Sequence, residues 1–261
     1  MFSHWIPLIW LAATLAPLFF MKRWINRHVQ GLGLLLLGND QAAMFLYFVL
    51  LLPGILIHEL SHWLVANLLG VRTGKISLWP SQRRGKQIRL GSVRIARTDP
   101  LRASLIGVAP LIGGSLAILI IGQLMLGLGG LEEALLNGRW EQVGESLLAS
   151  LKVPDFWLWL YFIFAVSNAM LPSETDREPW RPVLLFVGLL ALLLYFTGWV
   201  RQDFGELGRA VPEVVATASL TGLSHLAYAF SLTVVVDAIF MVAIAILEML
   251  VSSLTGRRVE Y

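Results

Sequence analysis

Long apolar runs, separated by short polar segments, dominate the pattern along this chain. Several of the runs reach the roughly 20 residues that a helix needs to cross a bilayer. We therefore expect an all-α polytopic membrane protein with about six transmembrane helices, forming a single domain over residues 1–261. The predicted spans are Trp5–Phe20, Ala42–Leu69, Ala103–Leu128, Phe156–Leu171, Pro182–Val200 and Ser224–Ser252.

Two segments between the runs have other patterns. From Lys75 to Arg97, apolar and polar residues alternate on both sides of a Ser-Gln-Arg-Arg-Gly-Lys turn, which predicts a short membrane-associated β-hairpin after the second helix. The alternation slips at Gly91-Ser92, which suggests a β-bulge there; a basic solvated loop is the alternative interpretation. Over Leu131–Leu151, leucine and valine recur at helical spacing, which predicts an amphipathic helix lying at the membrane interface.

The composition agrees with a lipid environment. The chain is 57% hydrophobic and only 14% charged, with a net charge of +3, which is less charge than soluble domains carry. It has no cysteine, so disulfides and thiolate metal ligands are excluded, and any metal site would use His, Asp or Glu. We expect the lipid bilayer as the surroundings and no nucleic acid as a partner.

The basic residues predict the orientation of the chain. They cluster between Arg72 and Arg97, and cytoplasmic loops carry an excess of Lys and Arg. A cytoplasmic N-terminus places this cluster and the larger share of the basic residues inside, whereas Lys22, Arg23 and Arg27 favour the opposite orientation. Following the larger bias, we expect both termini in the cytoplasm. The first run is interpreted as a retained helix, because it has no basic start and no obvious cleavage site.

The stretch His58-Glu59-Leu60-Ser61-His62 interrupts the second apolar run. An ionisable residue at bilayer depth is by default a functional hypothesis. Residues four apart share one face of a helix, so His58 and His62 can bind one metal ion, with Glu59 placed to act as a base on a water molecule there. Zinc suits imidazole ligands and an open catalytic position. The alternative is a pair of histidines that only make hydrogen bonds between helices.

Two histidines leave a zinc ion short of a protein ligand. The other histidines lie near a terminus, in a loop and at the start of the last run, which favours a carboxylate. Asp176 follows a helix break after the fourth run. Asp237 stands alone in the last apolar run. Its position is equally consistent with two roles, as a metal ligand or as a group that makes hydrogen bonds between helices.

With these features, the chain resembles the site-2 protease family of intramembrane metalloproteases over Ala42–Arg181. His-Glu-Leu-Ser-His lies on the second span, near the cytoplasmic side, and Gly107–Gly114 is similar to the family's glycine-proline element. Asp176 follows Asn168 at the spacing of the family's Asn-x-x-Pro-x-x-x-x-Asp-Gly motif. The chain departs from that motif at Pro172, which comes one residue late, and after Asp176, where arginine replaces glycine.

The resemblance implies one zinc ion held by His58, His62 and Asp176, with Glu59 as the catalytic base and Asn168 holding the substrate or transition state. It favours Asp176 over Asp237 as the third ligand. The implied activity is that of a zinc metalloendopeptidase that cleaves transmembrane segments of membrane proteins near the cytoplasmic side. We expect a multi-pass protein of a prokaryotic plasma membrane; a regulatory membrane partner is left open.

Two other functions remain open from the sequence. One is a metal-dependent membrane hydrolase that acts on a non-peptide substrate. The other is a catalytically silent relative that binds membrane helices and regulates them. The presence of Glu59 favours an enzyme, because a binding module needs no base beside its histidines.

Overall fold

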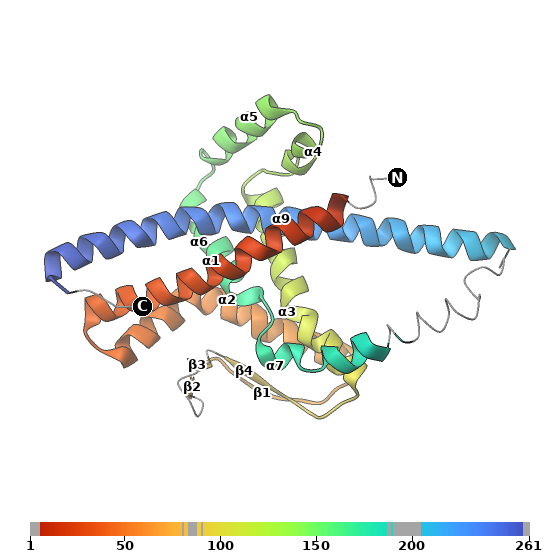
Figure 1. Cartoon of the computed structure of the whole chain (residues 1–261), viewed down its shortest axis with the longest axis horizontal. Coiled ribbons are helices and arrows are strands. Elements are labelled where there is room, and N and C mark those ends of the chain that lie inside the picture. Colours follow the sequence, from red (N-terminus) through yellow and green to blue (C-terminus); the bar gives the residue numbers. More distant parts are fainter. Residues whose placement is uncertain are drawn as a thin grey trace.

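A computed structural model describes residues 6–79, 81–82, 88–89, 91–186, 189 and 205–257, most of them in helices. Figure 1 shows α9, the longest of these helices, running the full width of the molecule, with α1 packed along it. Helices α2, α3 and α6 pack against one another beside this pair. The helices are α1 (Ile6–Leu37), α2 (Asp40–Leu68), α3 (Pro100–Ile120) with the π-helical turn η1 (Ile121–Met125), α4 (Leu131–Leu136), α5 (Trp140–Ser150), α6 (Phe156–Met170), α7 (Glu174–Arg177) and α9 (Gly205–Thr255).

Three helical segments of the described chain are long and apolar enough to cross a membrane: Asp40–Leu68, Pro100–Met125 and Thr221–Thr255. A fourth arises if Phe156–Met170 and Glu174–Phe186, which meet at a bend of 55°, form one broken span. The three segments overlap the second, third and sixth predicted spans, and the broken span overlaps the fourth. The structure therefore supports a mostly helical protein with three or four candidate spans.

The remaining two predicted spans are not among these segments, except that the end of the broken span includes Pro182–Phe186. Trp5–Phe20 falls largely within α1, which does not end at Phe20 but continues as a helix through Lys22, Arg23 and Arg27. Most of Pro182–Val200 lies outside the described residues. The expected count of six spans thus remains a prediction.

Short strands occupy the segment expected to form a β-hairpin. Strand β1 (Thr73–Ser77) pairs antiparallel with β4 (Ser92–Ile95), and β2 (Ser81–Gln82) pairs antiparallel with β3 (Ile88–Arg89). The first pair begins two residues before the predicted boundary. Its register shifts between Thr73 and Ile76, whereas the sequence indicates a bulge at Gly91-Ser92.

The predicted amphipathic helix over Leu131–Leu151 is two helices, α4 and α5. Gly138 separates them with a φ of +66°, a left-handed conformation that glycine adopts without a steric penalty and that commonly ends a helix. In α5, the large apolar side chains of Trp140, Leu147 and Leu148 are exposed. A location of this face in the membrane interface remains a prediction.

Glycines let the central helices approach one another closely. Gly54 of α2 lies against the backbone carbonyl of Ala165 in α6, and Gly114 of α3 lies against the side chain of Met170 at the end of α6. A Cβ atom at either glycine would overlap these atoms. The contacts bring the end of α6, and the break that follows it, directly beside the middle of α2.

Candidate metal centre

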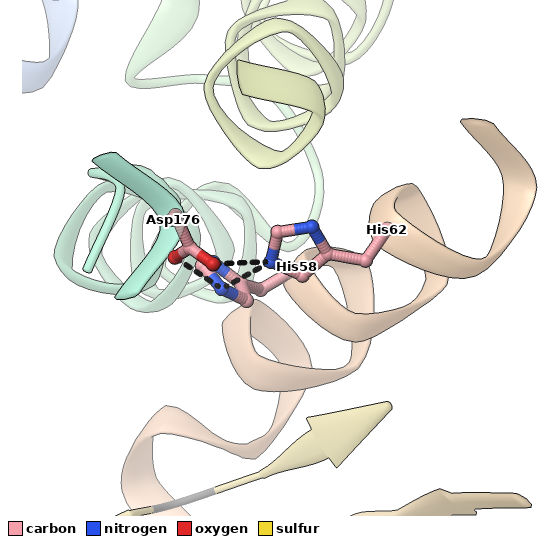
Figure 2. Close-up of side chains that lie close together, drawn as sticks. All are labelled: His58, His62 and Asp176. Atoms are coloured by element: carbon pink, nitrogen blue, oxygen red, sulfur yellow. Dashed lines mark hydrogen bonds and ion pairs between the residues drawn. The ribbon is translucent and has the colours of Figure 1, made fainter. Parts of the chain in front are cut away.

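His58 and His62 lie one turn apart on α2 and face Asp176 of α7. Figure 2 shows the three side chains turned toward one another. His62 Nε2 lies 3.3 Å from Asp176 Oδ1, and His58 Nε2 lies 3.8 Å from Asp176 Oδ2. The two Nε2 atoms are 3.2 Å apart. Among the described residues, these three form a group whose possible ligand atoms all lie within 4.8 Å of one another.

The second nitrogen of each imidazole is held by a backbone carbonyl. His58 Nδ1 lies 2.9 Å from the oxygen of Ala169, and His62 Nδ1 lies 2.8 Å from the oxygen of Ile106. A carbonyl oxygen only accepts, so each Nδ1 carries the proton and donates it. Both Nε2 atoms then present a lone pair to Asp176. This arrangement is typical of metal-binding histidines, whose other ring nitrogen donates to a carbonyl or a carboxylate.

This donor set fits a zinc ion. Two imidazole lone pairs and a carboxylate are all acceptors, so their close approach needs a cation or an added proton between them. Ligand atoms about 2.0–2.2 Å from a zinc ion at tetrahedral angles are about 3.3–3.6 Å apart. The two Nε2 atoms are 3.2 Å apart, and each lies 3.3 or 3.8 Å from a different oxygen of Asp176, which is near that range. The arrangement could therefore hold a metal ion, and the residue types suit zinc.

The break between α6 and α7 sets the position of Asp176. Helix α6 ends at Met170, and Leu171 adopts an extended conformation ahead of Pro172. Ser173 then caps α7. Asp176 Oδ2 accepts hydrogen bonds from the backbone N of Ser173 at 2.8 Å and from its hydroxyl at 2.6 Å. This reciprocal capping box fixes the carboxylate and leaves Oδ1 facing His62.

Glu59 is buried, with 6% of its surface exposed, and lies beside the histidines on α2. It is outside the group of possible ligand atoms. The backbone of Gly91, just before β4, packs on its side chain: a Cβ atom at Gly91 would lie 2.7 Å from Glu59 Oε1. The backbone that leads into β4 therefore covers Glu59 from one side.

The candidate metal ligands and Glu59 line one cavity of about 1010 Å³. It is lined by the histidines, Glu59 and Asp176, by residues of β4 and the segment that follows it, and by one face of α1. A cavity with polar groups in its wall is the setting in which irregular backbone is tolerated at membrane depth. It provides room for water and for an extended segment of chain beside the candidate metal ligands.

Asn168 and Asp237 form a separate polar contact between α6 and α9. Both are almost fully buried, with 3% and 2% of their surface exposed. Asp237 Oδ1 accepts hydrogen bonds from Ser167 Oγ at 2.8 Å and from Asn168 Nδ2 at 3.2 Å. Asp237 is not in the candidate metal group, and its contacts match the interhelical role that the sequence left open. Asn168 lines the cavity.

The sequence did not indicate several residues that shape this site. Gly91 packs on Glu59, Ser167 binds Asp237, and Lys22 of α1 lines the cavity. Lys22 was interpreted only through its charge. Gly91 was interpreted only as part of a possible β-bulge, and no local pattern identifies Ser167, because both residues act through contacts with distant parts of the chain.

Comparison with known proteins adds no assignment. The chain matches no protein-family model, no curated protein and no solved structure. The site is therefore interpreted from its own geometry.

Proposed function

We propose that this protein is a zinc-dependent intramembrane endopeptidase, as its resemblance to the site-2 protease family implies. The observation that carries the proposal is the close grouping of His58 Nε2, His62 Nε2 and the Asp176 carboxylate, within 4.8 Å of one another, with Glu59 on the same helix as the histidines. The two histidines and Glu59 lie on α2, a helix able to span a membrane, and Asp176 reaches them from α7. A hydrolase that acts inside a membrane needs this combination of an apolar helix and a polar, cavity-lining site.

In this proposal, His58, His62 and Asp176 hold the zinc ion. Bound there, zinc would supply a Lewis acid that polarises the scissile carbonyl and lowers the pKa of water toward neutrality. Ala169 and Ile106 orient the imidazoles through their carbonyl oxygens. Ser173 orients the carboxylate of Asp176.

Glu59 acts as the general base and then the general acid. Its carboxylate takes a proton from the attacking water and delivers it to the amide nitrogen of the leaving segment. The packing of Gly91 on this side chain limits the positions that the carboxylate can adopt. A positioned acid–base group of this kind contributes about 10²–10⁴-fold to a rate.

The substrate is a transmembrane segment that must unwind locally before its amides become accessible. Strand β4 pairs with β1 on one edge, and Val93 and Ile95 of β4 line the cavity. An extended segment could pair with the other edge of β4 by β-augmentation, in which main-chain hydrogen bonds supply the affinity. The bias of basic residues supports cleavage near the cytoplasmic side, and we propose a prokaryotic plasma membrane as the location.

Metal content and cleavage together test the proposal. Purified full-length protein should contain about one zinc ion per chain, as catalytic zinc sites built from two histidines and a carboxylate do, and His58→Ala with His62→Ala should lack it. The wild-type protein in lipid vesicles should cut a transmembrane peptide that has a central helix break. Bound zinc without peptide cleavage would favour the non-peptide hydrolase or the silent regulator.

A further inference from the structure

Lys22 brings a positive charge to the wall of the cavity from α1. It lies in the middle of α1, is half-buried, and lines the same cavity as His58, Glu59 and Asp176. Its ammonium donates to the backbone oxygen of Leu171, just after α6, at 3.4 Å. An ionisable side chain among apolar helices calls for a named partner.

The carboxylates near Lys22 are engaged elsewhere. Asp176 and Asp237 are close enough to act on the ammonium electrostatically, as is the guanidinium of Arg177. No ion pair within 4.0 Å joins Lys22 to a carboxylate in the part of the chain that the structure describes. Asp176 faces His62 and Ser173, and Asp237 accepts hydrogen bonds from α6. An ammonium has three donors, and the bond to Leu171 uses one of them.

The same face of α1 continues as a row of polar residues. Asn26 and Gln30 follow Lys22 at intervals of four residues, which places all three on one helix face, and all three line the cavity. Asn26 Oδ1 accepts a hydrogen bond from the Tyr47 hydroxyl at 2.6 Å, so the amide group of Asn26 remains a donor. This wall of the cavity therefore offers a cation and a hydrogen-bond donor.

The contacts limit the distance from Lys22 to the candidate metal ligands. Leu171, whose oxygen accepts from Lys22, is two residues from Ala169, whose oxygen contacts His58 Nδ1. Two residues of chain cover at most about 7 Å, so the path from the ammonium to the His58 ring is at most about 14 Å. An extended peptide covers that length in about four residues.

We propose that Lys22 binds a carboxylate of the substrate that lies within about four residues of the bond to be cut. Lys22 is then a specificity-determining residue of the proposed intramembrane endopeptidase, and the inference rests on that proposed function. The carboxylate could come from an Asp or Glu side chain, or from the free C-terminus of a segment already cut. In both cases a buried charge pair with the ammonium favours the correctly placed segment.

Binding of model peptides tests this inference without requiring cleavage. The protein is the full-length Glu59→Gln variant in lipid nanodiscs, which keeps the peptides intact during the measurement. The probes are fluorescent Leu/Ala transmembrane peptides with a central Gly-Pro break. In the first series, each peptide carries a single Glu at one position up to four residues from the break. The second series carries Gln at the same positions. In the third series the peptides end at these positions, either in a free carboxylate or in an amide. Dissociation constants are measured for every peptide.

At least one carboxylate peptide should bind about tenfold more tightly than its matched Gln or amide peptide. Adding Lys22→Met should remove this preference and leave the affinity for the uncharged peptide unchanged, and Lys22→Glu should prefer a Lys peptide. Arg23→Met is the matched control, because Arg23 carries the same charge on the next, exposed position, and it should keep the preference. The series that shows the preference identifies the source of the carboxylate.

Three results would overturn the inference: no carboxylate preference with Lys22 present, a preference that survives Lys22→Met, or an equal loss of affinity for charged and uncharged peptides. If Lys22→Met does not fold, Lys22→Gln serves instead, because it removes the charge and keeps a donor. Cleavage by the wild-type protein is scored separately. A carboxylate preference without cleavage refutes the proposed function alone, whereas cleavage without the preference refutes the role of Lys22 alone.

Discussion

Gly107 of α3 lies directly against the backbone carbonyl oxygen of Asp176 in α7, so that a Cβ atom at position 107 would overlap that oxygen. The ring nitrogen of Trp180 would lie 3.3 Å from the same Cβ. The space that a side chain at position 107 would fill is thus occupied by the segment that carries Asp176, a candidate metal ligand. The position of Asp176 depends on this contact as well as on its own capping box.

Gly107→Ala should therefore weaken zinc binding, although alanine is about 1 kcal/mol better than glycine inside a helix. The added methyl group pushes Asp176 away from His62. Displacing a group that orients a ligand typically weakens metal affinity about 10- to 100-fold. Competition with a chelator measures the affinity. The control is Gly144→Ala in α5, where a Cβ meets nothing within 4 Å; equal affinities in the two variants would contradict the prediction.

Glu59→Gln should retain zinc and lose peptide cleavage. Glutamine has nearly the same shape as glutamate but cannot take a proton at neutral pH, so the loss should be at least about 10²–10⁴-fold. Zinc content and the rate of cleavage of a model transmembrane peptide are measured in the same preparation. Glu141→Gln, on the exposed surface of α5, is the matched control. Full cleavage by the Glu59→Gln protein would refute the assigned role.

Asp176 and Asp237 should respond differently to removal of their carboxylates. Asp176→Ala removes one of the three proposed zinc ligands and should weaken binding by more than the roughly 10- to 100-fold typical of an orienting group. Asp237→Ala should keep the metal, because Asp237 contacts Ser167 and Asn168 instead of the histidines. It should lower stability by about 1–3 kcal/mol for each donor left unpaired.

The comparison requires zinc titration and thermal unfolding of both variants, each shown to be folded. Loss of the metal in Asp237→Ala together with its retention in Asp176→Ala would reverse the assignment. The last helix would then belong to the metal site.

Local spacing is what made the centre of the site predictable. His58 and His62 are four residues apart on a strongly apolar run, so a helix alone places them together. One indication for Asp176 was its spacing from Asn168, which matches the family motif, because no local rule brings α7 to α2. The break near Pro172 supplied the other indication, since a carboxylate after a helix end can turn into a cavity.

Tertiary contacts account for what the sequence left unpredicted. Lys22 follows an apolar run and resembles a residue at a membrane boundary, yet α1 continues past it and turns it toward the cavity. The sequence indicated Gly91 only as a possible β-bulge and Gly107 only as part of a glycine-proline element, whereas the structure shows their contacts with Glu59 and Asp176. Gly138 divides one predicted amphipathic helix into two, because its left-handed conformation ends the first helix. The spacing of apolar residues over Leu131–Leu151 continues across this break and so does not reveal it.

The orientation of the chain gives a final prediction. In Figure 1 the strands lie at one end of α3 and helices α4 and α5 lie at the other. Because α3 with η1 is long enough to span a membrane, the two groups should face opposite sides. The excess of basic residues between Arg72 and Arg97 predicts that the strands lie on the cytoplasmic side.

The chain has no cysteine, so a single introduced cysteine reports its own location. In spheroplasts, Ser81→Cys at the start of β2 should resist an impermeant thiol reagent and react only after lysis. Glu145→Cys on the exposed face of α5 should react before lysis. The reverse pattern would invert the topology and place the candidate metal centre nearer the outer face. Labelling of both cysteines on the same side would show that α3 does not cross the membrane, because one crossing between positions 81 and 145 is what separates them.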